Sequence, residues 1–251
     1  MTRSLVFRDL GMIYPDGTRA LVGVDLGVED GEFVSVLGPS GCGKSSLLRV
    51  AAGLADYSSG SLFVDRSQLG YTFQDATLLP WRTVQRNAEL LLELRGVAAA
   101  ERERIACEKL ALVGLSGFER HYPRQLSGGM RMRASLARSL TLDPSVLLFD
   151  EPFGALDEIT RERLNDELLA LHGRQGFTAL FVTHSIPEAV FLSHRVVVMS
   201  PRPGRVLEQF NVPFTYPRAA ALRYSPEFTL LCGEVSRALR EATAASMASA
   251  A

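Results

Sequence analysis

A glycine-rich string, GPSGCGKSS at residues 38–46, carries the residue types that a phosphate group requires. It fits the spacing G-x-x-x-x-G-K-[ST], in which Lys44 and Ser45 are the last two members. Glycines let the backbone wrap tightly, so that successive N–H groups point at phosphate oxygens. Lys44 would reach the β- and γ-phosphates of a nucleotide, and the Ser45 hydroxyl would ligate Mg²⁺.

The flanking residues place this string between a strand and a helix. The apolar run EFVSVL precedes it and a helical pattern follows it, so a helix N-terminus adds its positive dipole end. Without that context, the string could be a Gly-rich turn with a chance lysine. Within the loop, Cys42 is expected to be a small packing residue. The predicted nucleotide-binding residues of the loop are Gly38, Pro39, Ser40, Gly41, Cys42, Gly43, Lys44, Ser45 and Ser46.

Two acidic residues follow the apolar run VLLF at 146–149. A buried strand would deliver Asp150 at its carboxyl end, where α/β folds bind ligands, as a second partner for Mg²⁺, directly or through water. Glu151 would then orient and deprotonate a water that attacks the γ-phosphate. The alternative is a strand that ends in a solvated acidic turn. Together with the loop, these residues predict binding and hydrolysis of a nucleoside triphosphate.

A second candidate anion site is LSGGM at 126–130, which precedes a helical pattern. Ser127, Gly128 and Gly129 would leave free N–H groups at a helix N-terminus. One nucleotide does not need two such cradles in one chain. The string resembles the signature motif of the ATP-binding cassette (ABC) ATPases, and the resemblance extends from about residue 4 to about residue 240.

The resemblance implies a head-to-tail homodimer with ATP and Mg²⁺ as its cofactors. Each ATP would lie between the phosphate-binding loop of one subunit and the signature of the other, so Ser127, Gly128 and Gly129 would bind nucleotide held by a second copy. Closing of this dimer on ATP and opening after hydrolysis could drive another protein.

Four further residues take roles by the same resemblance. Tyr14 is similar to the aromatic residue that stacks on adenine, although it could be an ordinary β-edge tyrosine. Gln74, in YTFQD, resembles the glutamine that contacts Mg²⁺ and the attacking water, with an exposed loop amide as the alternative. Asp157 resembles the aspartate that communicates across the dimer, and it could also cap the helix that follows. His184 resembles the switch histidine on the γ-phosphate; a histidine satisfied at a strand end is the alternative.

These residues require an α/β framework to position them. Short apolar or β-branched runs alternate with longer helical patterns. The predicted strands are 32–37, 61–64, 69–73, 146–149, 179–182 and 196–199. The predicted helices are 45–52, 84–95, 101–113, 129–140 and 160–172.

This pattern predicts the fold class α/β, and the resemblance to ABC ATPases implies a P-loop NTPase (RecA-like) core with two additions. The first thirty residues predict an antiparallel β subdomain, and about 84–140 predict an inserted helical subdomain. We expect a single ABC ATPase domain over 1–241. The Ala/Ser-rich end at 242–251 is expected to be a disordered, frayed tail.

Composition and the lack of targeting signals argue against several classes of protein. The 251 residues carry 27 Lys+Arg against 28 Asp+Glu, a net charge of −1, which does not favour a nucleic-acid partner. Three cysteines show neither a disulfide framework nor a CxxC pair, as expected in a reducing cytosol. No signal peptide is evident, and the apolar runs fall short of the ~18 residues of a spanning helix. A membrane connection would therefore come through a partner.

The segment THSIPEAVFLSHRVVVMSPRPGRV at 183–206 resembles ATPases of the nitrate/sulfonate/taurine importer group. Met130 is also common in that group, although Met130 and Met132 replace polar side chains that many ABC proteins carry. The resemblance implies a bacterial importer subunit on the cytoplasmic face of the inner membrane, with separate permease subunits and, indirectly, a periplasmic or lipid-anchored solute-binding protein. The cargo would be a small anion or a related compound.

Three questions remain open at this point. The string TLLPWRTVQRN at 77–87 is where such ATPases meet their permease, and its Trp81 could be a docking residue or a core anchor. A soluble ABC protein that acts on DNA or ribosomes is a second reading, but paired cassettes, coiled-coil insertions and basic arms are all missing. An inactive regulator is a third reading, and it conflicts with Lys44, Asp150, Glu151 and His184 all being present.

Overall fold

A three-stranded antiparallel sheet forms one side of the protein, whose computed structural model describes residues 3–249. Its strand order is β2-β1-β4, with bounds β1 (Arg3–Ile13), β2 (Arg19–Glu29) and β4 (Ser59–Val64). Buried and exposed residues alternate along much of β2, as expected for a sheet with one covered face. The antiparallel subdomain predicted for the first thirty residues is therefore present.

A six-stranded sheet forms the centre of the molecule, in the order β5-β6-β7-β3-β8-β9. Neighbouring strands are parallel except that β9 runs antiparallel to β8. The strands β3, β6 and β7 are buried at every position, which explains their consecutive apolar residues. The bounds are β3 (Phe33–Leu37), β5 (Leu69–Thr72), β6 (Val146–Asp150), β7 (Thr178–Val182), β8 (Arg195–Met199) and β9 (Val206–Asn211).

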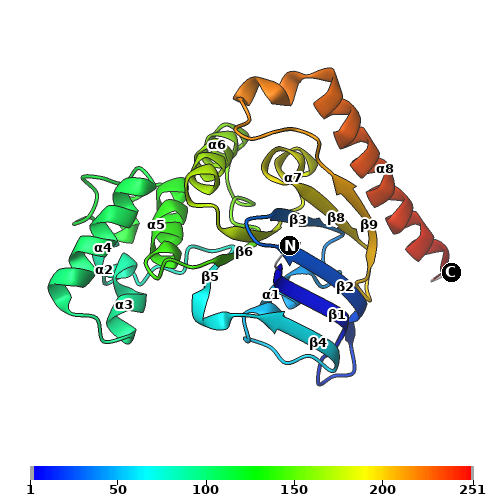
Figure 1. Cartoon of the computed structure of the whole chain (residues 1–251), viewed down its shortest axis with the longest axis horizontal. Coiled ribbons are helices and arrows are strands. Elements are labelled where there is room, and N and C mark those ends of the chain that lie inside the picture. The colour runs from blue at the N-terminus through cyan, green and yellow to red at the C-terminus, as the bar shows by residue number, and fades with distance from the viewer. Residues whose placement is uncertain (1–2, 250–251) are drawn as a thin grey trace.

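Helices cover both faces of the central sheet (Figure 1). Helix α1 fills the space between this sheet and the antiparallel sheet, whereas α5 to α8 pack on the opposite face. The helix bounds are α1 (Lys44–Ala51), α2 (Val84–Ala88), α3 (Leu90–Leu94), α4 (Ala99–Leu112), α5 (Gly128–Leu140), α6 (Glu158–Gln175), α7 (Ile186–Leu192) and α8 (Pro226–Ser249). Short 3₁₀ turns are η1 (Arg66–Gln68), η2 (Pro123–Gln125) and η3 (Ala220–Tyr224).

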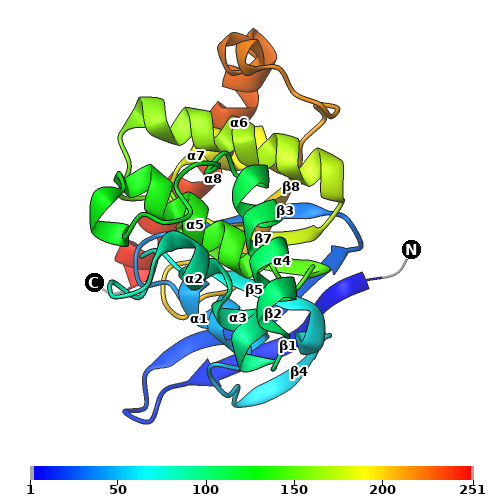
Figure 2. The ribbon, with the colours of Figure 1, turned by 90° about the vertical axis from the view of Figure 1, so that its left-hand side faces the viewer.

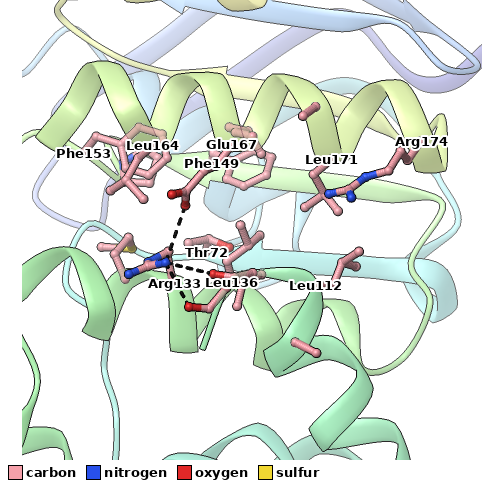
Figure 3. A pocket seen from close by; sticks show the side chains of 17 residues that line it. Thr72, Leu112, Arg133, Leu136, Phe149, Phe153, Leu164, Glu167, Leu171 and Arg174 are labelled. Carbon is pink, nitrogen blue, oxygen red and sulfur yellow. Dashed lines mark hydrogen bonds and ion pairs between the residues drawn. The ribbon is translucent and has the colours of Figure 1, made fainter. Parts of the chain in front are cut away.

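The chain between β5 and β6 contains the helices α2 to α5, which project to one side of the core (Figure 1) and face the viewer in Figure 2. The predicted helix 84–95 is divided at Glu89 into α2 and α3. Where α4 and α5 meet β5, β6 and α6, a cavity of about 280 Å³ remains (Figure 3). Arg133 of α5 connects the two sides of this joint. Its guanidinium lies 3.8 Å from the carboxylate of Glu167 on α6 and donates to the Val113 carbonyl at 3.1 Å.

The C-terminal segment differs from the expectation. Helix α8 continues through Ser249, so most of the segment 242–251 is helical rather than a disordered tail; residues 250–251 lie outside the described residues. Alanine has the highest helix propensity, and an Ala-rich sequence extends a helix that is already anchored. Phe228 and Val235 provide that anchor, because both are buried in the main core.

Candidate nucleotide-binding site

The loop between β3 and α1 has the geometry of a phosphate cradle. Gly43 lies at φ +112°, and a Cβ there would come within 2.8 Å of the Ala20 carbonyl oxygen, so only glycine fits. The Lys44 side chain arches back over the loop. Its ammonium donates to the carbonyls of Gly38 at 2.8 Å and Pro39 at 3.0 Å. The loop thus holds the cation through two carbonyls, and Lys44 also lines the cavity beside the loop.

A cavity of about 240 Å³ opens beside this loop. The phosphate-binding loop and the start of α1 form its floor, and residues from three other segments complete it. Its lining consists of Tyr14, Ala20, Ser40, Gly41, Gly43, Lys44, Ser45, Ser46, Arg49, Glu151 and Arg202. Cys42 is buried beneath it, in agreement with a packing role.

Tyr14 reaches this cavity from the end of the antiparallel sheet. Its hydroxyl lies 2.8 Å from the Ser46 hydroxyl, and either oxygen can be the donor. The ring therefore stands beside the phosphate-binding loop, where an adenine could stack on it. Stacking itself stays a prediction.

Both carboxylate oxygens of Asp150, the last residue of β6, accept a hydrogen bond. The Ser45 hydroxyl donates to one at 2.7 Å, and the Tyr71 hydroxyl donates to the other at 3.1 Å. A hydroxyl and a carboxylate at this separation are the hard oxygen ligands that Mg²⁺ prefers, so this pair fits the predicted metal. Burial and the charge of Asp150 raise the pKa of Tyr71, which keeps its hydroxyl protonated as a donor.

Sequence reasoning missed Tyr71. The parallel pairing of β5 with β6 brings the carboxyl ends of both strands to one edge of the sheet, and Tyr71 lies near that end of β5. An aromatic hydroxyl at the end of a strand predicted next to the acidic strand is the pattern that could have indicated it.

Glu151 and His184 face each other at the same edge. The imidazole Nδ1 lies 3.2 Å from a Glu151 carboxylate oxygen. Glu151 has φ +47°, an unfavourable value for a residue with a Cβ, and the surrounding backbone holds it there. Its amide donates to the Val182 carbonyl at 2.9 Å, and its carbonyl accepts from Gly154 at 3.1 Å. These bonds fix the backbone of Glu151, which lines the cavity.

Hydrogen bonds to helix α7 hold the turn that carries His184. Thr183 donates its hydroxyl to the carboxylate of Glu188, and the amide of Ser185 donates to the Thr183 hydroxyl at 3.0 Å. Glu188 is almost fully buried, and burial raises its pKa to about 6. This network was also not predicted from the sequence, because a single glutamate in a short helix indicates nothing specific.

Some predicted site residues are not brought to this cavity. Gln74 is exposed in the segment after β5, and no hydrogen bond joins it to the pair Ser45–Asp150 among the described residues. The signature also lies outside the cavity lining. Ser127 caps α5, accepting from the Met130 amide at 3.2 Å, so the helix N-terminus is intact despite the methionines at 130 and 132.

Asp157 caps α6 as expected, accepting from the Thr160 amide at 3.0 Å. Hydrogen bonds from Thr160 lower the pKa of this exposed carboxylate, which stays charged at the helix N-terminus. The capping role is thus observed, and communication across a dimer stays a prediction.

Trp81 is 70% exposed, so its interpretation as a core anchor is wrong. The segment that carries it is nevertheless well defined, because the buried Asn87 holds it. The Asn87 amide oxygen accepts from the Leu79 amide at 2.7 Å, and its nitrogen donates to the carbonyls of Leu79 and Arg82, both at 3.1 Å. An indole presented to solvent by a rigid segment is typical of a contact surface.

The fold and the site together define a P-loop nucleotide-binding protein with an inserted helical subdomain. The ABC transporter family model matches residues 21–154, and the chain belongs to this family. It is 43% identical to the taurine import ATP-binding protein TauB of Yersinia pestis bv. Antiqua, over 84% of this chain and 88% of that one. It is 42% identical to the aliphatic sulfonates import ATP-binding protein SsuB of Bacillus thuringiensis subsp. konkukian, over 80% and 81%.

Solved structures agree with this assignment. The dimeric post-hydrolysis structure of the ATP-binding cassette MJ0796, bound to ADP and Pi, superposes with a TM-score of 0.75 at 31% identity, over 84% of this chain and 100% of that one. The predicted ABC ATPase fold class is confirmed. Among the helices of residues 3–249, none combines the length and the hydropathy that a membrane span requires.

Proposed function

We propose that this chain is the ATP-hydrolysing subunit of a bacterial ABC importer. In this proposal, residues 1–241 form one ABC ATPase domain. Two copies close head to tail on two ATP molecules, and hydrolysis reopens them. The motion would be passed to separate transmembrane permease subunits that import a small anion of the nitrate, sulfonate or taurine type.

The observation that carries this proposal is the grouping of two pairs at one edge of the central sheet. Ser45 and Asp150 are joined at 2.7 Å, and Glu151 and His184 are joined at 3.2 Å. The first pair would hold Mg²⁺, which supplies charge neutralisation on the phosphates when bound. Glu151 would take the proton of the attacking water, and His184 would contact the γ-phosphate while it orients the Glu151 carboxylate.

The remaining roles follow the family arrangement. Tyr14 would stack on adenine and Gln74 would reach Mg²⁺ and the water once the dimer closes. The signature at 127–129 would bind the nucleotide of the other copy, and Asp157 would communicate between the two sites. The dimeric cassette bound to ADP and Pi supports this geometry. The import substrates named for the two relatives support the choice of cargo.

The proposal places the subunit on the cytoplasmic face of the inner membrane, held there by the permease. A periplasmic or lipid-anchored solute-binding protein would deliver the cargo on the other side. Exposed Trp81 on its rigid segment supports a permease contact at this surface.

Glu151→Gln tests the catalytic assignment. The variant keeps the shape of the side chain but cannot accept a proton, so we expect hydrolysis to fall by at least about 100-fold. MgATP should still drive a monomer-to-dimer transition, measured by analytical ultracentrifugation. Glu234→Gln, which changes an exposed carboxylate on α8, is the matched control. An unchanged hydrolysis rate in the Glu151 variant would remove the proposed role.

A further inference from the structure

The segment between β8 and β9, residues 200–205, packs directly against the phosphate-binding loop. The amide of Gly204 donates to the Ala20 carbonyl at 2.9 Å, and its carbonyl accepts from Val22 at 3.1 Å. A Cβ at Gly204 would come within 2.2 Å of the Cys42 carbonyl oxygen, so the two backbones are in contact. This segment is therefore fixed relative to the nucleotide site.

The segment is also rigid within itself. The Ser200 hydroxyl donates to the Pro203 carbonyl at 2.8 Å and accepts from the Arg205 amide at 3.0 Å. The amide of Ser200 donates to the Arg205 carbonyl at 2.9 Å, which closes the turn. A side chain at the tip of this turn has its Cα position fixed, so less entropy is lost when it binds a ligand.

Arg202 lies at that tip and lines the nucleotide cavity. Its Nε donates to the Gly41 carbonyl at 3.0 Å, and a Cβ placed on Gly41 would lie 3.1 Å from one of its terminal nitrogens. Within residues 3–249, no carboxylate forms an ion pair with this guanidinium. Asp16 lies close enough to feel this charge: its pKa is lowered mainly by hydrogen bonds from Thr18 and slightly by Arg202.

The cavity therefore contains three cations, Lys44, Arg49 and Arg202, against one lining carboxylate, Glu151. Such a surplus fits a polyanion. Lys44 is bonded to the carbonyls of Gly38 and Pro39, whereas Arg202 is bonded to the carbonyl of Gly41, so the two cations line the cavity from different points of the loop. A guanidinium whose Nε is already bonded still has terminal N–H groups that can bind phosphate oxygens in a fixed fork.

We infer that Arg202 is a further nucleotide-binding residue, which contacts the β- and γ-phosphates of the bound nucleotide from the segment 200–205. The inference rests on the proposed function and assigns a second cation to the same site. The residue acts in two ways: its charge attracts the phosphate chain, and its bond to Gly41 stabilises the loop in the binding conformation.

Calorimetric titration with ATP, ADP and AMP tests this assignment in the hydrolysis-deficient Glu151→Gln background, with Mg²⁺ present. We expect Arg202→Gln to raise the Kd for ATP and ADP about five- to tenfold, as for the loss of a charge-assisted hydrogen bond at a partly exposed site. The Kd for AMP, which has no β-phosphate, should stay within twofold. Arg202→Lys keeps the charge without the fork, and should be intermediate.

Arg205→Gln is the matched control, because Arg205 is an exposed cation on the same turn outside the cavity lining. Its affinities should equal those of the parent. The parent affinity for ATP should also fall more steeply with ionic strength than that of Arg202→Gln. Equal losses for AMP and ATP would show that Arg202 only supports the turn, and unchanged affinities would show that it contacts no phosphate; either result overturns the inference. In both cases, ATP binding by the parent would leave the proposed function standing.

Discussion

Asp150 occupies the most constrained position in the site, because each of its two carboxylate oxygens already has a protein donor. The Ser45 hydroxyl can keep donating to this carboxylate while a lone pair of its oxygen ligates a metal, and Tyr71 can stay bonded throughout. Tyr71 is thus a positioning residue: it holds one oxygen of the carboxylate, and the other oxygen, next to Ser45, would ligate a bound metal. Outer partners of this kind commonly tune metal affinity.

Tyr71→Phe should therefore weaken Mg²⁺ activation without weakening nucleotide binding. The variant removes one hydrogen bond to a charged acceptor, which corresponds to about 1–2 kcal/mol, or roughly a tenfold higher Mg²⁺ concentration for half-maximal hydrolysis. The measurement is the initial rate of phosphate release at saturating ATP, as free Mg²⁺ is varied. ATP affinity in the presence of EDTA should not change.

Tyr57→Phe serves as the control, because Tyr57 is 40% exposed and its hydroxyl has no hydrogen-bond partner in the described chain. If both variants require the same Mg²⁺ concentration as the parent, Tyr71 does not position the carboxylate.

Helix α7 shows how an element outside the loop and the acidic strand contributes to the site. It begins at Ile186, after the turn 183–185 that follows β7, with Ser185 as its cap, and Glu188 in its first turn accepts the Thr183 hydroxyl. His184 lies between these residues, so the orientation of its backbone depends on a buried carboxylate. One oxygen of Glu188 has no hydrogen-bond partner in the described structure, which makes its charged form costly.

Glu188→Gln should stabilise the protein at neutral pH. Burial raises the pKa of Glu188 to about 6 in the folded protein, against 4.5 for an ordinary glutamate, so the folded state binds more protons between these values. The free energy of unfolding then falls as pH rises through this window, by about 2 kcal/mol in total. Glutamine cannot ionise, so the variant should equal the parent near pH 4.5 and exceed it by about 2 kcal/mol at pH 7.

Urea unfolding of both proteins at a series of pH values measures this difference. Other titrating groups, such as His172 with its pKa lowered by burial to about 4, are common to both proteins and cancel. Glu234→Gln on α8 should show no pH-dependent difference. If the difference in free energy of unfolding between the parent and Glu188→Gln is the same at every pH, Glu188 is already ionised over the whole pH range.

At the scale of the whole molecule, the sequence predicts the α/β core, the antiparallel sheet and the helical insertion, because each has a clear pattern. Strand β9 was not predicted, because it is a half-exposed edge strand with polar residues and pairs with only one strand of the sheet, β8. Helix α8 was not predicted, because its Ala-rich end resembles a disordered tail. Glu151 could be predicted from its place after a buried strand and His184 from the family resemblance, whereas Tyr71 and Arg202 depend on which segments lie side by side, and that is set by packing.

The placement of the insertion relative to the core is a further property that no local pattern contains. Helix α5 carries the signature at its N-terminus, and its inner side borders the cavity at the joint (Figure 3). A joint that is incompletely packed loses less dispersion energy when its two sides shift. The signature and the Trp81 segment both belong to this side of the molecule, so a permease bound there could be coupled to the position of the signature.

Trp81→Ala should separate permease binding from ATP hydrolysis. Because Trp81 is 70% exposed and outside the nucleotide cavity, the isolated subunit should keep its hydrolysis rate. A buried aromatic anchor commonly contributes 2 kcal/mol or more to an interface, so affinity for the permease should fall about 30-fold. The measurement is binding of the purified subunit to its permease in nanodiscs, with Tyr224→Ala as control, since Tyr224 is 79% exposed on η3. If the Trp81→Ala variant binds the permease as tightly as the Tyr224→Ala variant does, the permease contacts another surface. The segment around Trp81 would then not couple the permease to the position of the signature.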